Sequence, residues 1–315
     1  MTRRELWIRL LLYPTHTLPT ALAPVLVGVG LAIRDGVFAP LPALLAFVAS
    51  WLVHVAGVFT DNHELLRRHP ALPEHPELLD AVAGDRLALS TLEAATWLCL
   101  IVAAACGAWL AWIGGPVALA IGLVGVVSAI AYAGGPWPYA PRGLADPVFF
   151  LMFGVVAVAA TWYIQAVSLV SDPGPWPTRA VEVPLAAYLV GLPVGALVTA
   201  VLVIDDIRDR HWDAKKGWRT TAVRFGLRGS RTAFVTLVAF AYAAPFAIWL
   251  SPGFSAWVLL PLATLPLATL PLAARAVRAV LTHDDTASLF PWTPRTAMLG
   301  MVYAALSGAG LALSR

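Results

Sequence analysis

Residues Val203–Gly226 read VIDDIRDRHWDAKKGWRTTAVRFG and directly follow an apolar run. This stretch places four acids within nine residues: Asp205, Asp206, Asp209 and Asp213. At about 100° per residue on a helix they lie at about 0°, 100°, 40° and 80°, so all four point within one quadrant. Carboxylates arranged in this way repel one another unless a cation lies between them, and hard oxygen ligands suit Mg²⁺.

Basic residues come next in the chain, because Lys215, Lys216 and Arg219 follow the aspartates at once. Anionic and cationic groups therefore meet at one membrane edge, and a substrate whose diphosphate is bridged by Mg²⁺ fits this arrangement. The alternative is a solvated loop whose basic residues fix the membrane topology. Topology explains the basic residues but not four acids on one face, so we favour the metal–diphosphate interpretation.

The composition is that of a membrane protein: 59% of the 315 residues are hydrophobic and only 12% are charged. A soluble protein of this length would need far more polar surface, so the lipid bilayer is the expected surrounding. The net charge is only +3, and no cluster of basic residues suggests a nucleic acid. We also infer no obligate protein partner.

Nine apolar segments are each close to the ~20 residues that span a bilayer. Their approximate ranges are residues 16–33, 40–60, 89–112, 115–133, 147–169, 184–204, 232–250, 256–274 and 295–313. The sequence therefore predicts an all-α polytopic membrane protein with about nine transmembrane helices, forming one domain over residues 1–315.

The basic residues also predict the orientation. With the N-terminus in the cytoplasm, 18 of the 21 lysines and arginines lie on the cytoplasmic side, and Arg34, Arg179 and Arg315 lie outside. This asymmetry is the pattern expected of cytoplasmic loops. Two long cytoplasmic loops, about 61–88 and 205–231, then carry the acids, so we expect the active site to face the cytoplasm.

The first of these loops begins with a smaller pair of acids, Asp61 and Glu64. Residues three apart share a helix face. Such a pair is common at helix ends, but on the same membrane side as residues 205–213 it predicts the second half of a metal clamp.

A second dense stretch is Tyr132–Gly154, YAGGPWPYAPRGLADPVFFLMFG, whose glycines and prolines predict a tight turn at the cytoplasmic edge. Arg142 adds charge there, and Phe149 and Phe153 then enter the membrane. The alternative is an ordinary helix hairpin with aromatic residues at the interface.

Polar residues at membrane depth are costly and often functional. Tyr163 and Gln165 are candidates for hydrogen bonds to an aromatic hydroxyl, but a role in joining helices is an equal alternative. His54 lies seven residues before Asp61 on a similar face. For His54 we favour a packed, hydrogen-bonded histidine over a catalytic base.

The two dense stretches resemble a known family. Val203–Gly226 is similar to the second aspartate-rich motif of the UbiA superfamily of intramembrane prenyltransferases. Tyr132–Gly154 resembles the glycine–proline block of its 1,4-dihydroxy-2-naphthoate polyprenyltransferase branch. PTHTLPTALAPVLVGVGLA (residues 14–32) looks like that branch's first helix, and the segment from Thr296 like its last. The resemblance thus runs nearly from end to end.

The resemblance implies an activity: Mg²⁺-dependent transfer of an isoprenyl group from isoprenyl diphosphate to an aromatic acceptor, here 1,4-dihydroxy-2-naphthoate in menaquinone biosynthesis. The implied catalytic residues are Asp61, Asp209 and Asp213. The implied Mg²⁺ ligands are Asp61, Glu64, Asp205, Asp209 and Asp213. The implied diphosphate-binding residues are Lys216, Arg219 and Arg142. The implied acceptor or prenyl pocket contains Tyr132, Phe149, Phe153, Tyr163, Gln165 and His54.

Some positions depart from the family pattern. Asp205 and Asp206 stand where the naphthoate branch usually has two asparagines, and Thr60 replaces the asparagine of the first motif. Three alternatives therefore stay open: a different aromatic acceptor, cyclisation of the isoprenyl diphosphate without any acceptor, or a lipid-binding relative without catalysis.

Overall fold

The computed structural model describes residues 17–68, 82, 84, 87–170, 181–263 and 269–314. Every regular element within these ranges is a helix. Seven helical segments are long and apolar enough to cross a bilayer. One of them is bent into two arms, and the region from 256 to 282 adds a further interrupted helix, so the prediction of an all-α bundle with about nine helices is confirmed.

The elements in chain order are α2 (Thr17–Arg34), α3 (Pro40–Arg68), α5 (Leu89–Ala131), η1 (Ala140–Arg142), α6 (Ala145–Phe149), the π-helical η2 (Phe150–Val156), α7 (Ala157–Val170), α8 (Leu185–Leu189), α9 (Leu192–Lys216), α10 (Thr221–Trp249), η3 (Ala256–Leu259), α11 (Leu260–Ala263), α12 (Leu270–Thr282), α13 (Thr286–Leu289) and α14 (Trp292–Leu313). Most of the expected loop 61–88, and residues 14–16 at the start of the expected first helix, lie outside the described residues.

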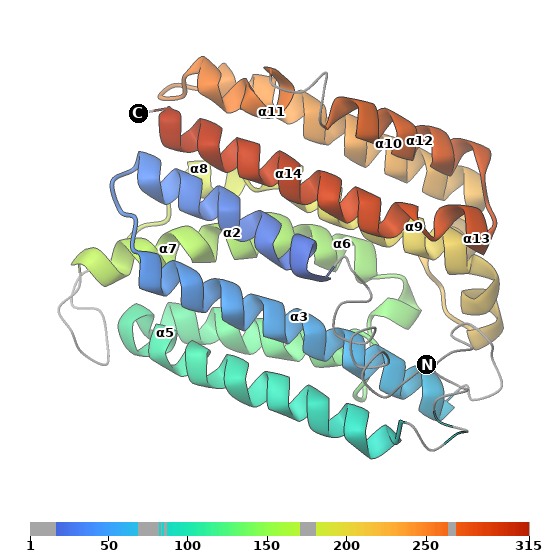
Figure 1. Cartoon of the computed structure of the whole chain (residues 1–315). Coiled ribbons are helices and arrows are strands. Elements are labelled where there is room, and N and C mark those ends of the chain that lie inside the picture. Colours follow the sequence, from blue (N-terminus) through green and yellow to red (C-terminus); the bar gives the residue numbers. More distant parts are fainter. Residues whose placement is uncertain are drawn as a thin grey trace.

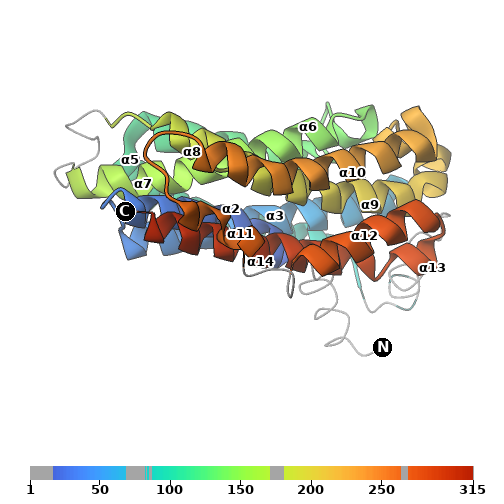
Figure 2. The same cartoon turned by 90° about the horizontal axis from the view of Figure 1, so that it is seen from above.

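The long helices run alongside one another in a bundle (Figures 1 and 2). α3 packs against α5, α14 against α2, and α10 against α9. The C-terminal ends of α3 and α9 lie at the same end of the bundle as α13 (Figure 1). The bundle therefore brings together the ends of the two helices that carry the acidic residues.

Two helices continue into the regions expected as cytoplasmic loops. α3 runs on to Arg68, past Asp61, and α9 runs on to Lys216. α9 ends at Gly217, whose φ of 76° is the left-handed conformation that commonly closes a helix. The acids of residues 205–213 are thus fixed on a regular helix, as their spacing predicts, and not on a flexible loop.

α5 contains the sharpest bend. Gly115 has φ 64° and ψ −154°, and Pro116 follows it, so the helix is two arms joined at this glycine. Only glycine adopts such a backbone without strain. The Tyr163 hydroxyl donates a hydrogen bond of 2.7 Å to the carbonyl of Gly114 and attaches the bend to α7. The bend separates the third and fourth expected spans.

Glycine also sets how closely α2 and α14 approach. A Cβ placed on Gly30 would lie 2.2 Å from the carbonyl oxygen of Gly308. In a membrane, small residues at helix interfaces allow backbones to pack in direct contact. The close contact between these two helices is therefore possible because glycine, which has no side chain, is at position 30.

We expect Gly30→Ala to destabilise the bundle, because the added methyl group would force α2 and α14 apart, and such overpacking costs about 1–3 kcal/mol. The matched control is Gly107→Ala, since a Cβ there meets nothing within 4 Å. Thermal unfolding of the purified protein in detergent measures both. Equal midpoints for the two variants would contradict the close contact.

Candidate functional site

A cavity of about 790 Å³ opens among α3, α5, η2, α7 and α9. Most of its wall is apolar, but one end is highly charged. Five aspartates and two basic residues line it: Asp61, Asp205, Asp206, Asp209, Asp213, Arg208 and Lys216. An oily cavity with a charged end suits a ligand that has a long apolar chain and a charged head.

Arg208 lies between two of the acids on α9. Its Nη1 is 2.5 Å from Oδ1 of Asp205, and its Nε donates to Oδ1 of Asp209 at 2.8 Å. The hydroxyl of Thr293, on α14, also donates to Asp205 at 2.5 Å. Arg208 therefore offsets part of the negative charge, and α14 helps to hold the acidic end of α9.

Asp213 is nearly fully buried, with 4% of its surface exposed. The Lys216 ammonium lies 3.1 Å from its Oδ1, and the Thr220 hydroxyl donates to Oδ2 at 3.3 Å. The lysine also lies 4.2 Å from the centre of the Trp218 ring. This buried ion pair closes the charged end of the cavity.

Asp206 is also buried, at 7% exposure. It lies close enough to four other carboxylates for their charges to repel it: Asp146, Asp213, Asp205 and Asp209. A buried carboxylate among like charges is unfavourable unless positive charge is supplied. At Asp206 this repulsion is therefore relieved either by a proton or by a cation beside the carboxylate.

The acid of α3 meets those of α9 around Tyr132, the first residue after α5. Asp61, Asp206 and Asp213 all lie near enough to act electrostatically on the Tyr132 hydroxyl. Asp61 also lines the cavity, as Asn62 does. Asp61 and the acids of α9 therefore line the same cavity, and the metal clamp that they are expected to form stays a prediction.

Some predicted site residues lie elsewhere. Glu64 does not line the cavity, because its carboxylate is 2.7 Å from Arg67 and also pairs with Arg68. Arg142 and Arg219 are exposed, and neither lines the cavity. Of the three residues predicted to bind diphosphate, Lys216 alone lines the wall.

The two dense sequence stretches are nevertheless attached to each other. The Thr221 hydroxyl donates to the Asp146 carboxylate, and the backbone N–H of Arg219 donates to the carbonyl of Pro141 at 2.9 Å. Between them, Gly143 has φ 74°, and a Cβ on it would lie 2.2 Å from the carbonyl oxygen of Arg219. Arg142 and Arg219 therefore belong to a joint beside the charged end.

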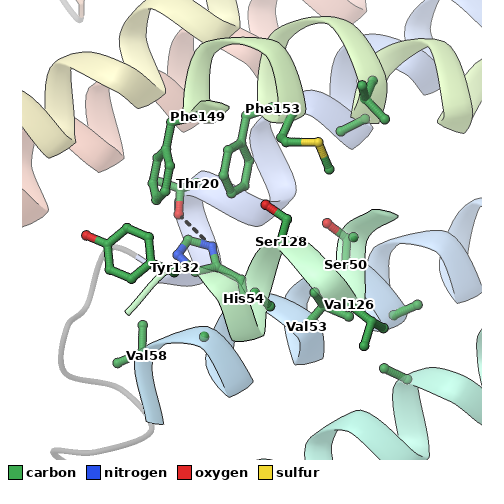
Figure 3. A pocket seen from close by; sticks show the side chains of 18 of the residues that line it. Thr20, Ser50, Val53, His54, Val58, Val126, Ser128, Tyr132, Phe149 and Phe153 are labelled. Atoms are coloured by element: carbon green, nitrogen blue, oxygen red, sulfur yellow. Dashed lines mark hydrogen bonds between the residues drawn. The ribbon is translucent and has the colours of Figure 1, made fainter. Parts of the chain in front are cut away.

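Aromatic rings form the wall next to this end (Figure 3). The ring of Phe149 lies 5.8 Å from that of Tyr132 and 5.2 Å from that of Phe153. Tyr132 also meets Tyr139 edge to face at 5.7 Å. The pKa of the Tyr139 hydroxyl is raised, because the effect of burial exceeds the lowering by its hydrogen bond with Ser128. These phenols thus stay neutral and act as hydrogen-bonding groups.

Of the remaining residues predicted to form the acceptor or prenyl pocket, two line the cavity and one does not. Tyr163 and His54 line the cavity, whereas Gln165 is fully buried away from it. The Gln165 amide donates to the carbonyl of Thr161 at 2.7 Å and accepts from the N–H of Ala39 at 3.4 Å. Its contacts fit the alternative role of joining helices.

Two residues of the charged end were absent from the predicted site. Asp206 shares the quadrant of the other acids, and this spacing was the signal for including it. Arg208 lies three residues after Asp205, a spacing at which opposite charges meet on a helix. The distribution of basic residues assigns Arg208 a role in topology alone, although its spacing also predicts the ion pair with Asp205 that the structure contains.

The sequence profile of the UbiA prenyltransferase family matches residues 87–293. The 1,4-dihydroxy-2-naphthoate octaprenyltransferase of Mycobacterium tuberculosis (strain ATCC 25618 / H37Rv) is 32% identical over 239 residues, which cover 75% of this chain and 76% of that protein. The enzyme of the same name from Escherichia coli (strain K12) is 28% identical over 235 residues, or 72% of this chain and 70% of that one.

Solved structures share the fold. A UbiA homologue from Aeropyrum pernix K1, in its apo form, matches with a TM-score of 0.58 at 18% identity, covering 93% of this chain and 97% of that one. A UbiA homologue from Archaeoglobus fulgidus, bound to GPP and Mg²⁺, matches with a TM-score of 0.57 at 18% identity, covering 96% and 99%. These likenesses confirm the arrangement of the helices.

We expect Gly143→Ala to loosen the joint between the two stretches, because the substitution adds a clash with Arg219 to a left-handed backbone that costs about 1–2 kcal/mol. Gly135→Ala is the matched control: its φ is 72°, but a Cβ there meets nothing within 4 Å. Limited proteolysis of residues 132–145 in detergent should cut Gly143→Ala faster. Equal cleavage rates would show that the contact does not hold the turn.

Proposed function

The chain belongs to the UbiA prenyltransferase family, and we propose that it transfers an isoprenyl group from isoprenyl diphosphate to 1,4-dihydroxy-2-naphthoate in menaquinone biosynthesis. One observation carries the reaction: the acids of α3 and α9 line one end of a cavity whose remaining wall is mostly apolar. A diphosphate head and an isoprenyl chain match these two parts. The acceptor is inferred from the relatives that bear this name.

The residues at the charged end fit Mg²⁺. Five carboxylates face two basic side chains, so a diphosphate would be repelled unless further positive charge accompanies it. Among the described residues no three acidic, histidine or cysteine side chains are already close enough to hold an ion. Mg²⁺ is commonly bound through one or two carboxylates together with substrate phosphates, so a complete protein cage is not required.

We therefore propose Asp61, Asp206, Asp209 and Asp213 as the residues that hold Mg²⁺. Asp205 remains a predicted ligand, but its carboxylate already contacts Arg208 and Thr293. Glu64 is a less favourable ligand, because its carboxylate is paired with arginine side chains. When bound, Mg²⁺ offsets the charge of the diphosphate as a leaving group.

The protein's own side chains have three tasks in this reaction. Lys216 binds the diphosphate oxygens, and Arg208 is the second cation within reach of them. The faces of Tyr132, Phe149 and Phe153 stabilise the positive charge that develops on the allylic carbon. The apolar wall keeps water away from this carbon, so that the aromatic acceptor captures it.

We expect Asp209→Ala and Asp213→Ala each to lower Mg²⁺-dependent prenyl transfer more than about 100-fold, because several kcal/mol of charge stabilisation are lost. Asp284→Ala is the control, since this carboxylate is half exposed and pairs with Arg210 outside the cavity. The assay measures prenylated naphthoate in membranes. Activity retained by both cavity variants would remove the mechanism.

Cyclisation of the isoprenyl diphosphate is the second candidate. Its supporting observation is Thr60, which replaces the expected asparagine: the hydroxyl bonds to the carbonyl of Ala56 at 2.8 Å, and the residue does not line the cavity. Incubation with isoprenyl diphosphate alone separates the two functions. A cyclic hydrocarbon would support the second, and no product without naphthoate would support the first.

We also propose that the charged end faces the cytoplasm, as the distribution of basic residues predicts. In a background with serine at Cys99 and Cys106, Lys215→Cys and Phe38→Cys place thiols on exposed sites beyond opposite ends of the bundle. An impermeant maleimide should label Phe38→Cys in intact cells, and Lys215→Cys only after lysis. The reverse pattern would invert the topology.

A further inference from the structure

His54 is a polar residue in the mostly apolar part of the cavity wall. It lies on α3 seven residues before Asp61, which places it on nearly the same helix face and roughly 10 Å deeper along the axis. Its ring is 5.3 Å from that of Phe153 and 6.4 Å from that of Phe149 (Figure 3). His54 is therefore beyond the charged end, beside the aromatic wall.

The orientation of the imidazole is fixed by α2. Nδ1 of His54 lies 3.3 Å from the hydroxyl oxygen of Thr20, and that hydroxyl donates its proton to the carbonyl of Thr17 at 3.1 Å. A hydroxyl has one proton to donate, and because the carbonyl of Thr17 can only accept, we assign Nδ1 as the donor in its contact with Thr20. The neutral ring then carries its proton on Nδ1, and Nε2 is the basic nitrogen.

The position of His54 fits a hydroxyl of an aromatic acceptor. If the diphosphate is bound near Asp61, the allylic carbon lies just inside the charged end. An aromatic ring next to that carbon extends along α3 towards His54. The hydroxyl adjacent to the attacked ring carbon, which must supply the electron pair for the new bond, then needs a polar partner, because an unpaired hydroxyl in an apolar cavity is costly.

The surroundings of the histidine contain few charges. The lining residues of α2, η2 and α7 include no charged side chain. The titratable and charged groups that line the cavity around it are Tyr132, Tyr139 and Tyr163, with Asp61, the acids of α9, Arg208 and Lys216 at the charged end. His54 thus supplies the basic nitrogen that a ring hydroxyl would contact in the apolar part of the described wall.

We propose that Nε2 of His54 binds a ring hydroxyl of the aromatic acceptor and takes its proton during prenyl transfer; this rests on the function proposed above. The bond between the allylic carbon and oxygen breaks, and its electron pair leaves with the diphosphate. The acceptor ring supplies the pair for the new carbon–carbon bond as the hydroxyl proton passes to Nε2. The attacked carbon then loses its carboxylate as carbon dioxide, or its proton to the released diphosphate; the electron pair left behind restores the aromatic ring, and the oxygen recovers its proton from His54.

Thr20 acts through His54 as a positioning residue. Its hydroxyl keeps the Nδ1 proton in place and so keeps Nε2 basic and directed at the substrate. Positioned proton transfer by a histidine typically contributes 10²- to 10⁴-fold to a rate. Loss of the Thr20 contact should therefore lower the rate without touching the substrate directly.

The test uses the full-length protein with isoprenyl diphosphate and 1,4-dihydroxy-2-naphthoate. His54→Asn keeps a donor towards Thr20 but removes Nε2, and we expect kcat to fall about 100-fold. His54→Gln presents an amide oxygen near Nε2, so KM for naphthoate should stay within about threefold of wild type while kcat falls as in His54→Asn. In both variants KM for the diphosphate should change less than twofold.

Ser50→Ala is the matched control, because Ser50 lines the same cavity one helical turn before His54. Its kcat should stay within twofold of wild type. Thr20→Val should lower kcat about tenfold alone and not at all in the His54→Asn background, as expected for residues that act as one unit. Thermal midpoints of all variants show whether each is folded.

Retained kcat in His54→Asn and His54→Gln, with an active wild type, would overturn the role of His54 and leave the proposed function intact. A tenfold further loss on adding Thr20→Val to His54→Asn would overturn the coupling. A wild type that transfers no isoprenyl group to any aromatic acceptor would instead reject the proposed function and, with it, this inference.

Discussion

Repulsion between carboxylates at one end of an oily cavity dominates the electrostatics of the site. Asp206 is buried among four other acids, and the two basic side chains of the cavity cannot balance them. While these carboxylates are ionised, their mutual repulsion is unfavourable, and protonation or added positive charge relieves it. The same excess of negative charge is what the proposed cation, arriving with a diphosphate, would offset.

Rigid helices hold these charges in place. α9 keeps its acids in one quadrant down to the glycine at position 217, and α3 carries Asp61 past the expected membrane edge. The turn after α5 is attached to the turn after α9 through Thr221 and Asp146. Functional groups on such elements are positioned more accurately than groups on loops, and accurate placement is what a transfer reaction requires.

The cavity also separates the tasks of the reaction along α3. Asp61 is at the charged end, and His54 is about two turns deeper, beside the rings of Phe149 and Phe153. In the reaction that we propose, ionisation and recognition of the acceptor therefore take place at different depths. A single helix face sets the distance between them, because seven residues are almost two complete turns.

The helical class, the number of spans and the shared face of the acids on α9 could all be predicted from the amino-acid sequence, because they follow from local periodicity and hydrophobic length. Which of the candidate residues contact one another could not be predicted in this way. Glu64 is drawn to Arg67 and Arg68, and Gln165 to backbone groups, whereas Arg208 enters the cavity. Periodicity assigns a residue to a helix face, but the partner of that face depends on how distant helices pack.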